Sequence, residues 1–257
     1  PFGYYQNNTQ GTLALMHDCQ VQNVNTFVFA SSAACYGEVE DGICRVEDKN
    51  EPTNPYGWSK RMTEVMLNDF ARAYGMNSVS LRFFNVAGAD SDGEMGQEKD
   101  ATHIIARVME SAMAEETFTF FGNNYPTPDG TCIRDYIHVE DIASGINCSL
   151  DFLQDNPGAH IFNLGSGTGN SNAEIVDAVA MTTPLMVNTA YAEARAGDPP
   201  VLVAETKAGN NLLGWAPQHG LDSIVYTAYN WYMKTKTAST TNEVRDAYLH
   251  STKTSTS

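Results

Sequence analysis

Basic residues and long apolar runs are scarce in this 257-residue sequence. Only 15 Lys and Arg stand against 31 Asp and Glu, which gives a formal net charge of −16. A chain this acidic is repelled by the phosphates of nucleic acid, and its charge favours solubility. No apolar run approaches the roughly 20 residues that a membrane-spanning helix needs. We therefore expect neither a nucleic-acid partner nor a membrane partner.

Cysteine is also sparse. The five cysteines are odd in number and scattered along the chain, a pattern that argues against a disulfide framework or a zinc site. The six histidines show no paired ligand spacing either, so we expect no metal site. Free, scattered cysteines favour a reducing compartment, and we predict a cytoplasmic protein.

The third feature that the sequence lacks is a glycine-rich turn that binds a dinucleotide. Such a turn, Gly-x-x-Gly-x-x-Gly between a strand and a helix, lets the backbone approach a pyrophosphate at the positive end of the helix. The sequence contains no such motif. The run from Gly165 to Gly169 is rich in glycine and follows a strand-like segment, and we interpret it as a tight turn.

The most informative motif present is Asn54-Pro-Tyr-Gly-Trp-Ser-Lys60. Residues 55–74 predict a helix, because proline suits its first position, apolar residues recur at the helical period and Gly75 is a natural stop. On a helix Tyr56 and Lys60 share one face. The ammonium favours the phenolate, which makes the tyrosine a candidate general base. The spacing alone is usually that of a solvated surface pair.

Two strand-like segments flank this helix and make a site more plausible. The segment 26–32 looks like a buried strand that ends in two serines, and the segment 79–85 looks like the next strand. Strand, helix and strand in that order predict a βαβ unit with a parallel sheet. Ligands bind such sheets beyond the carboxyl ends of the strands. Ser32 and Asn85 are expected there, beside Tyr56.

These motifs resemble the extended short-chain dehydrogenase/reductase family, and within it the epimerases of nucleotide sugars. The resemblance runs from about Tyr4 to Trp231. Besides the motif at Tyr56, it is carried by residues 4–13, 27–37, 81–85, 121–139, 161–167 and 197–199. The segment 121–139 is the most specific. Dehydratases of the family tend to carry an Asp-Glu pair where this chain has Ser32 and Ala33, which argues against that activity.

The resemblance implies an α/β fold with an incomplete doubly wound parallel sheet of Rossmann type and a smaller mixed α/β substrate domain. Residues 1–86 and 134–165 would form the remaining NAD-binding domain, residues 87–133 and 166–236 the UDP-sugar domain, and residues 237–257 a disordered tail. Because the family's fold begins with a strand and a glycine turn, we expect its first elements to be absent here. A fragment, a truncated gene model and a split product all fit, and the chain as written is expected to be inactive.

The resemblance also implies chemistry. UDP-glucose and UDP-galactose would be interconverted by transient oxidation at sugar C4 with bound NAD. Tyr56 would take the hydroxyl proton, Ser32 would relay it, and Lys60 would bind the nicotinamide ribose. The expected cofactor site comprises Asn7, Ser31, Tyr56, Lys60 and Phe83. The expected substrate site comprises Ser32, Asn85, His103, Phe121, Arg134, Arg195, Asp198 and Leu202. The complete protein is expected to form a homodimer.

Two alternatives stay open. One is a related enzyme, such as a dehydratase or a reductase, that acts on another nucleotide sugar. The other is a non-catalytic remnant that binds a nucleotide sugar or a partner subunit. Without Tyr56 and Lys60 beside it, Ser32 would be interpreted as a strand-end hydroxyl that binds backbone. Without the resemblance, Arg134 with Asp135 would be interpreted as a surface pair.

Overall fold

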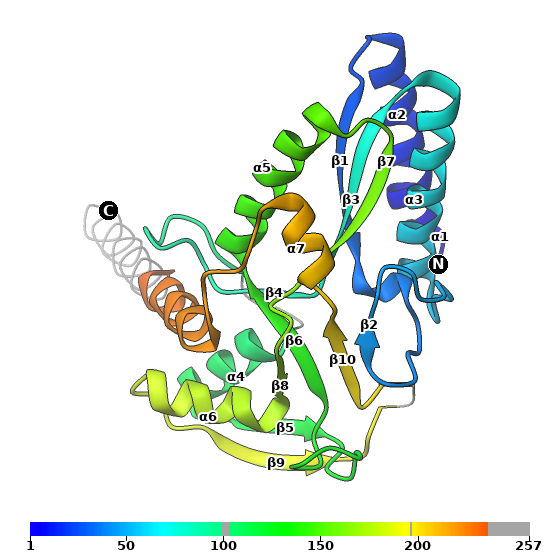
Figure 1. Ribbon diagram of the computed structural model, residues 1–257. Coiled ribbons are helices and arrows are strands. Elements are labelled where there is room, and N and C mark those ends of the chain that lie inside the picture. The colour runs from blue at the N-terminus through cyan, green and yellow to red at the C-terminus, as the bar shows by residue number, and fades with distance from the viewer. Residues whose placement is uncertain (99–102, 196, 236–257) are drawn as a thin grey trace, which may run out of the picture.

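A parallel sheet of three strands lies at the centre of the part of the fold that contains the N-terminus (Figure 1). The computed structural model describes residues 1–98, 103–195 and 197–235, so the expected tail at 237–257 lies outside the described residues. The sheet has the order β1-β3-β7 and consists of β1 (Thr26–Ser32), β3 (Asn77–Phe83) and β7 (Ala159–Leu164). All of its pairings are parallel. The predicted βαβ unit is confirmed.

The remaining strands form two smaller sheets. The larger has the order β2-β10-β6-β4 and consists of β2 (Ile43–Cys44), β10 (Val201–Ala204), β6 (Ile133–His138) and β4 (Asn85–Ala87), with the antiparallel β8 (Gly169–Ser171) beside β6. The other pairs β5 (Thr117–Phe121) with β9 (Asn188–Ala192). Asn85 was expected to end a strand of the first sheet, but it begins β4 in the second. The proposed domain limits stay a prediction.

The helix that carries Tyr56 has the predicted limits. It is α3 (Pro55–Tyr74), in which the Asn54 side chain accepts the N–H of Gly57 at 2.9 Å and Gly75 ends the helix at φ 72°. The N-terminal segment is helical as α1 (Phe2–Tyr4), a π-helical turn (Tyr5–Gln10) and α2 (Gly11–Val21). Later helices are α4 (Ile104–Met113), α5 (Val139–Asp155), α6 (Asn172–Thr182), α7 (Lys207–Leu213) and the helical residues 221–235.

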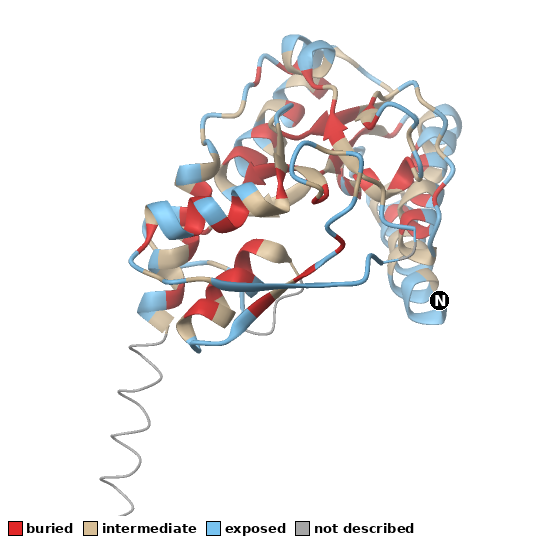
Figure 2. Ribbon diagram, turned by 90° about the horizontal axis from the view of Figure 1, so that it is seen from below, coloured by how far each residue is buried: buried red, intermediate tan, exposed pale blue. Residues whose placement is uncertain are grey.

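Helices cover both faces of the three-stranded sheet. In Figure 1, α2 and α3 lie on one side of it and α5 on the other. Val79 and Leu81 of β3 are fully buried and pack with Ile142 of α5, whereas Phe29 of β1 packs with Leu67 of α3. Figure 2 shows that the N-terminal helices are largely exposed by comparison. Among the described residues no helix is both long and apolar enough to cross a membrane.

The glycine-rich turn at 165–169 binds a carboxylate of the protein itself. Asp135 is fully buried and accepts the N–H of Ser166 at 2.7 Å, its hydroxyl at 2.7 Å and the N–H of Gly167 at 3.0 Å. The N–H of Ala204 reaches the same carboxylate at 3.1 Å. The turn's donors are therefore satisfied internally, in agreement with the predicted tight turn. Interpreting Arg134 and Asp135 as a surface pair is wrong.

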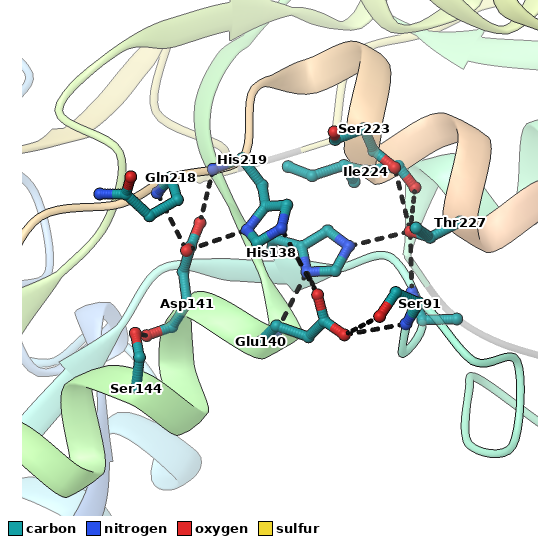
Figure 3. Close-up of polar contacts among 11 residues, drawn as sticks. Ser91, His138, Glu140, Asp141, Ser144, Gln218, His219, Ser223, Ile224 and Thr227 are labelled. Atoms are coloured by element: carbon teal, nitrogen blue, oxygen red, sulfur yellow. Dashed lines mark hydrogen bonds and ion pairs between the residues drawn. The ribbon is translucent and has the colours of Figure 1, made fainter.

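Two stacked histidines tie the N-terminus of α5 to the helix at 221–235 (Figure 3). The rings of His138 and His219 lie 4.3 Å apart with an angle of 24° between their planes. His138 is buried; its Nδ1 accepts the N–H of Glu140 at 3.1 Å, so the neutral ring carries its proton on Nε2, 2.9 Å from Thr227 Oγ1. His219 lies between two carboxylates, with Nε2 3.4 Å from Glu140 and Nδ1 3.0 Å from Asp141.

This histidine pair has the residue types of a metal site without its geometry. His138, Glu140 and His219 place their ligand-type atoms within 4.8 Å of one another. A histidine binds a metal through an in-plane lone pair. The only free lone pair of His138 already accepts the Glu140 N–H, and two stacked rings cannot direct their lone pairs at one ion. The arrangement suits a hydrogen-bonded junction better than a metal centre.

The junction predicts a loss of stability in mild acid. Burial, reinforced by the neighbouring His219, holds the pKa of His138 below its ordinary value. At pH values between that depressed pKa and the unfolded pKa of about 6.5, the unfolded chain binds a proton at His138 and the folded chain does not. The free energy of unfolding therefore falls as the pH falls. The loss amounts to about 1.4 kcal/mol for each unit by which the pKa is depressed.

Urea unfolding of the full-length parent and of its His138→Gln variant at about pH 7.5 and about pH 5.5 measures this loss. We expect the parent's free energy of unfolding to fall more between the two pH values than that of the variant. His17→Gln, at a histidine whose side chain is 68% exposed, is the matched control and should keep the parent's loss. Equal losses in the parent and in His138→Gln would contradict the assignment.

Candidate active site

Gly57 brings the first turn of α3 against the end of β1. A Cβ at this position would lie 2.3 Å from the carbonyl oxygen of Ala34, which belongs to the 3₁₀ turn that follows β1 (Ala33–Cys35). A side chain would therefore push the helix away from the strand. Glycine permits the close approach that places Tyr56, its neighbour in the chain, at the carboxyl end of the sheet.

A cavity of about 290 Å³ lies at this edge of the sheet. It gathers the three predicted catalytic residues, Ser32, Tyr56 and Lys60. The other predicted site residues that line it are Ser31, Phe83, Asn85 and His103. They come from β1, β3, β4 and the residue preceding α4, so only the fold brings them together.

The polar groups of this cavity are partly engaged. Lys60 Nζ donates to the carbonyl oxygen of Ala30 at 2.8 Å and lies 5.7 Å from the ring centroid of Tyr56. Burial lowers the pKa of Lys60. Ser32 Oγ accepts the N–H of Ala34 at 3.2 Å, as expected of a strand-end hydroxyl. Its own proton has no acceptor among the described residues, so it remains available for a ligand.

A buried ion pair lies directly behind the cavity. Glu64 stands one turn after Lys60 on α3, and Arg82 of β3 donates to its carboxylate through Nε at 2.9 Å and through a terminal nitrogen at 2.7 Å. The hydroxyl of Ser31 donates to the same carboxylate at 2.6 Å. Burial would raise the pKa of Glu64, but the bonds and charge of Arg82 hold it below its usual value.

Sequence reasoning missed this pair, although one signal was present. An arginine in the middle of an apolar strand must find a partner, because an unpaired buried charge is very costly. The sequence therefore indicated that Arg82 needs a buried acidic partner. That Glu64 is this partner depends on how α3 packs on the sheet. Ser31, expected at the cofactor, is engaged by Glu64.

A second cavity of about 250 Å³ lies between α4, β5 and β6. Six predicted substrate residues line it, and four of them do not line the first cavity: Phe121, Arg134, Arg195 and Asp198. Asn85 and His103 line both cavities, so the two cavities meet at these residues. Burial lowers the pKa of His103, which favours its neutral form.

The second cavity combines cations with an aromatic surface. Arg134 pairs with Asp198 at 3.2 Å, and the guanidinium of Arg195 lies 4.1 Å from the ring centroid of Phe121. Arginine's planar fork suits phosphate oxygens, and it also stacks on flat rings. Together these groups can bind an anionic ligand that carries a planar base.

Two predicted residues lie away from both cavities. Asn7 is exposed on the π-helical turn and lines neither of them. Leu202 lies on β10 opposite Arg134, and it packs against the buried cluster that contains Tyr36 and Phe84. Any contact of Leu202 with a ligand stays a prediction.

The sequence matches the NAD dependent epimerase/dehydratase family over residues 1–165. A UDP-glucose 4-epimerase from Azospirillum brasilense is 43% identical over 234 residues, which are 90% of this chain and 67% of the relative. Among solved structures, the UDP-glucose 4-epimerase from Brucella ovis in complex with NAD has a TM-score of 0.84 at 39% identity, with 88% of this chain and 70% of that chain covered.

A further structure is similar in fold and carries a sugar nucleotide. The UDP-glucose-4-epimerase from Stenotrophomonas maltophila with bound NAD and formylated UDP-arabinopyranose has a TM-score of 0.89 at 31% identity. The match covers 93% of this chain and 72% of that chain.

Proposed function

This chain belongs to the NAD dependent epimerase/dehydratase family, and from that premise we propose that it serves the interconversion of UDP-glucose and UDP-galactose at sugar C4. One observation carries the proposal. The cavity with Ser32, Tyr56 and Lys60 meets the arginine-lined cavity at Asn85 and His103. A ligand with a sugar at one end and a nucleotide at the other can therefore occupy both cavities at once.

NAD is the cofactor of this family, and the donor set of the first cavity fits its reactive end. Lys60 presents an ammonium group at the carboxyl edge of the sheet, where it would bind the nicotinamide ribose, and Phe83 offers an apolar wall. Bound NAD supplies the hydride acceptor at sugar C4. The residues of the chain supply the proton transfer and the orientation of the sugar.

Tyr56 would act as the general base. Its phenolate would accept the proton of the C4 hydroxyl, and the ammonium group of Lys60 lies 5.7 Å from the centroid of its ring. Ser32 shares the cavity, and its hydroxyl proton is uncommitted. It can therefore bind the sugar hydroxyl and pass the proton to Tyr56.

The second cavity would hold the nucleotide. Arg134 and Arg195 would grip the diphosphate, while Phe121, beneath the Arg195 guanidinium, would pack against the uracil. Asp198 would accept a hydrogen bond from a ribose hydroxyl, and Asn85 and His103 would contact the ligand where the cavities meet. The solved relative with a UDP-sugar supports this ligand class.

We further propose a homodimer in the cytoplasm. Trp58, Met62 and Val65 recur at helical spacing along one face of α3, each about two fifths exposed. An apolar stripe on a helix surface is typical of an interaction site. A second copy of the chain is the proposed partner. The described cysteines are all free, which fits a reducing compartment.

Tyr56→Phe in the full-length protein should lower kcat by roughly two to four powers of ten, because a general base is lost. Binding of UDP should be unchanged, since the phenol acts only on the proton in transfer. Steady-state kinetics with UDP-galactose, together with calorimetry of UDP binding, measures both quantities. Tyr74→Phe, at the exposed end of the same helix, is the control. Near-normal turnover in Tyr56→Phe would remove this residue from the mechanism.

Leu202→Tyr tests substrate breadth. We expect the parent to prefer UDP-glucose and UDP-galactose and to turn over the N-acetylated pair slowly but measurably, because leucine leaves more room beside the sugar than tyrosine does. In Leu202→Tyr the larger ring should lower kcat/KM for the N-acetylated UDP-sugars more than for UDP-glucose and UDP-galactose, because a steric clash with the acetamide group discriminates strongly against the larger substrates. Leu202→Met conserves the side-chain volume and should leave kcat/KM unchanged for both pairs of UDP-sugars. If Leu202→Tyr handles the N-acetylated sugars as well as the parent, Leu202 does not control access.

The 257 residues expressed alone should show little or no epimerase activity and should aggregate. Among the described residues β1 pairs only with β3, so its other edge is open. Phe2, Leu15 and Val21 of the adjoining helices are each more than half exposed. Open strand edges and exposed apolar surface promote association. Size-exclusion chromatography and an assay with UDP-galactose test this. A monodisperse chain with ordinary enzymatic turnover would refute it.

A further inference from the structure

We propose that Arg107 is a third ligand for the diphosphate of the nucleotide, an inference that rests on the proposed function. Arg107 lies on α4 one turn after His103, so the two side chains share a face of the helix. Both line the cavity that also contains Arg134 and Arg195. No sequence motif pointed to Arg107, because it stands within the amphipathic pattern of a helix.

The state of its side chain distinguishes Arg107 from the other two arginines. Arg134 is paired with Asp198, and Arg195 is stacked on Phe121. Arg107 is exposed, and its side chain makes no ion pair or hydrogen bond within the described part of the chain. A single unpaired arginine on a protein surface is ordinary. An unpaired arginine in the wall of a cavity, in a chain with a net charge of −16, is available for an anionic ligand.

The charges of the cavity match a diphosphate when Arg107 is counted. Its charged lining residues are three arginines and one aspartate, a net charge of +2. A nucleoside diphosphate sugar carries two negative charges on its phosphates. Without Arg107 the cavity would keep a net charge of +1, so one phosphate charge would stay uncompensated.

The position of Arg107 on α4 points the same way. The helix begins at Ile104 with no acidic residue in its first turn, and Arg107 lies near this end. A cation near a helix N-terminus opposes the helix dipole, whereas an anion there is favoured. A phosphate bound beside this end would compensate both the dipole and the guanidinium.

Calorimetric titration of the full-length protein with UDP and with uridine tests the inference. We expect Arg107→Met to weaken UDP binding by about tenfold, the loss of one charge-assisted hydrogen bond, and to leave uridine binding unchanged. Arg107→Lys keeps a point charge and should recover part of the loss. The salt dependence of UDP binding should also be shallower in Arg107→Met, since one phosphate-facing charge is gone.

Arg72→Met is the matched control. Arg72 is an exposed arginine in the last turn of α3 that lines neither cavity, so its loss changes the net charge equally and should leave UDP affinity unchanged. UDP affinity of Arg107→Met within twofold of the parent would overturn the inference and leave the proposed function standing. Equal losses for UDP and uridine would also overturn it. A parent that does not bind UDP would overturn the proposed function together with the inference.

Discussion

The buried ion pair of Glu64 and Arg82 is the interaction on which the active-site geometry depends. It joins α3, which carries Tyr56 and Lys60, to the middle strand of the parallel sheet, and the hydroxyl of Ser31 adds the end of β1. Both charged side chains are fully buried. Removing Glu64 would leave the Arg82 charge uncompensated in the interior, which costs about 3–5 kcal/mol. The helix therefore cannot shift along the sheet without breaking the pair.

The same network extends to the second sheet. The Arg82 guanidinium lies 4.5 Å from the ring centroid of Tyr36, and Tyr36 donates its hydroxyl proton to Asn163 of β7 at 2.5 Å. Asn163 in turn donates to the carbonyl oxygens of Cys44 at 2.8 Å and Glu205 at 3.1 Å. These contacts run from α3 through the parallel sheet to β2 and to the end of β10. They hold the first cavity in a defined relation to β10, which pairs with β6 in the wall of the second cavity.

The two cavities divide the chemistry between them. The first holds a serine, a tyrosine and a lysine, groups that can transfer a proton, whereas the second holds arginines and an aromatic ring, groups that can bind a ligand. Asn85 lines both cavities because β3 and β4 belong to different sheets and the chain crosses between them at Phe84. This crossing was invisible in the sequence, where residues 79–85 look like one uninterrupted strand.

The sequence by itself determined the local features: the limits of α3, the βαβ unit, the tight turn at 165–169 and the motif around Tyr56. Each depends on residues close together in the chain, through capping, periodicity and backbone freedom. Only the tertiary structure decided which distant charges meet. It paired Glu64 with Arg82, placed the glycine-rich turn against Asp135 and kept Asn7 and Leu202 off the cavity walls. It also left the Arg107 side chain in the second cavity without an ion pair among the described residues. Such choices depend on packing between elements far apart in sequence, because a charge is paired by whatever the fold brings within a few ångströms of it.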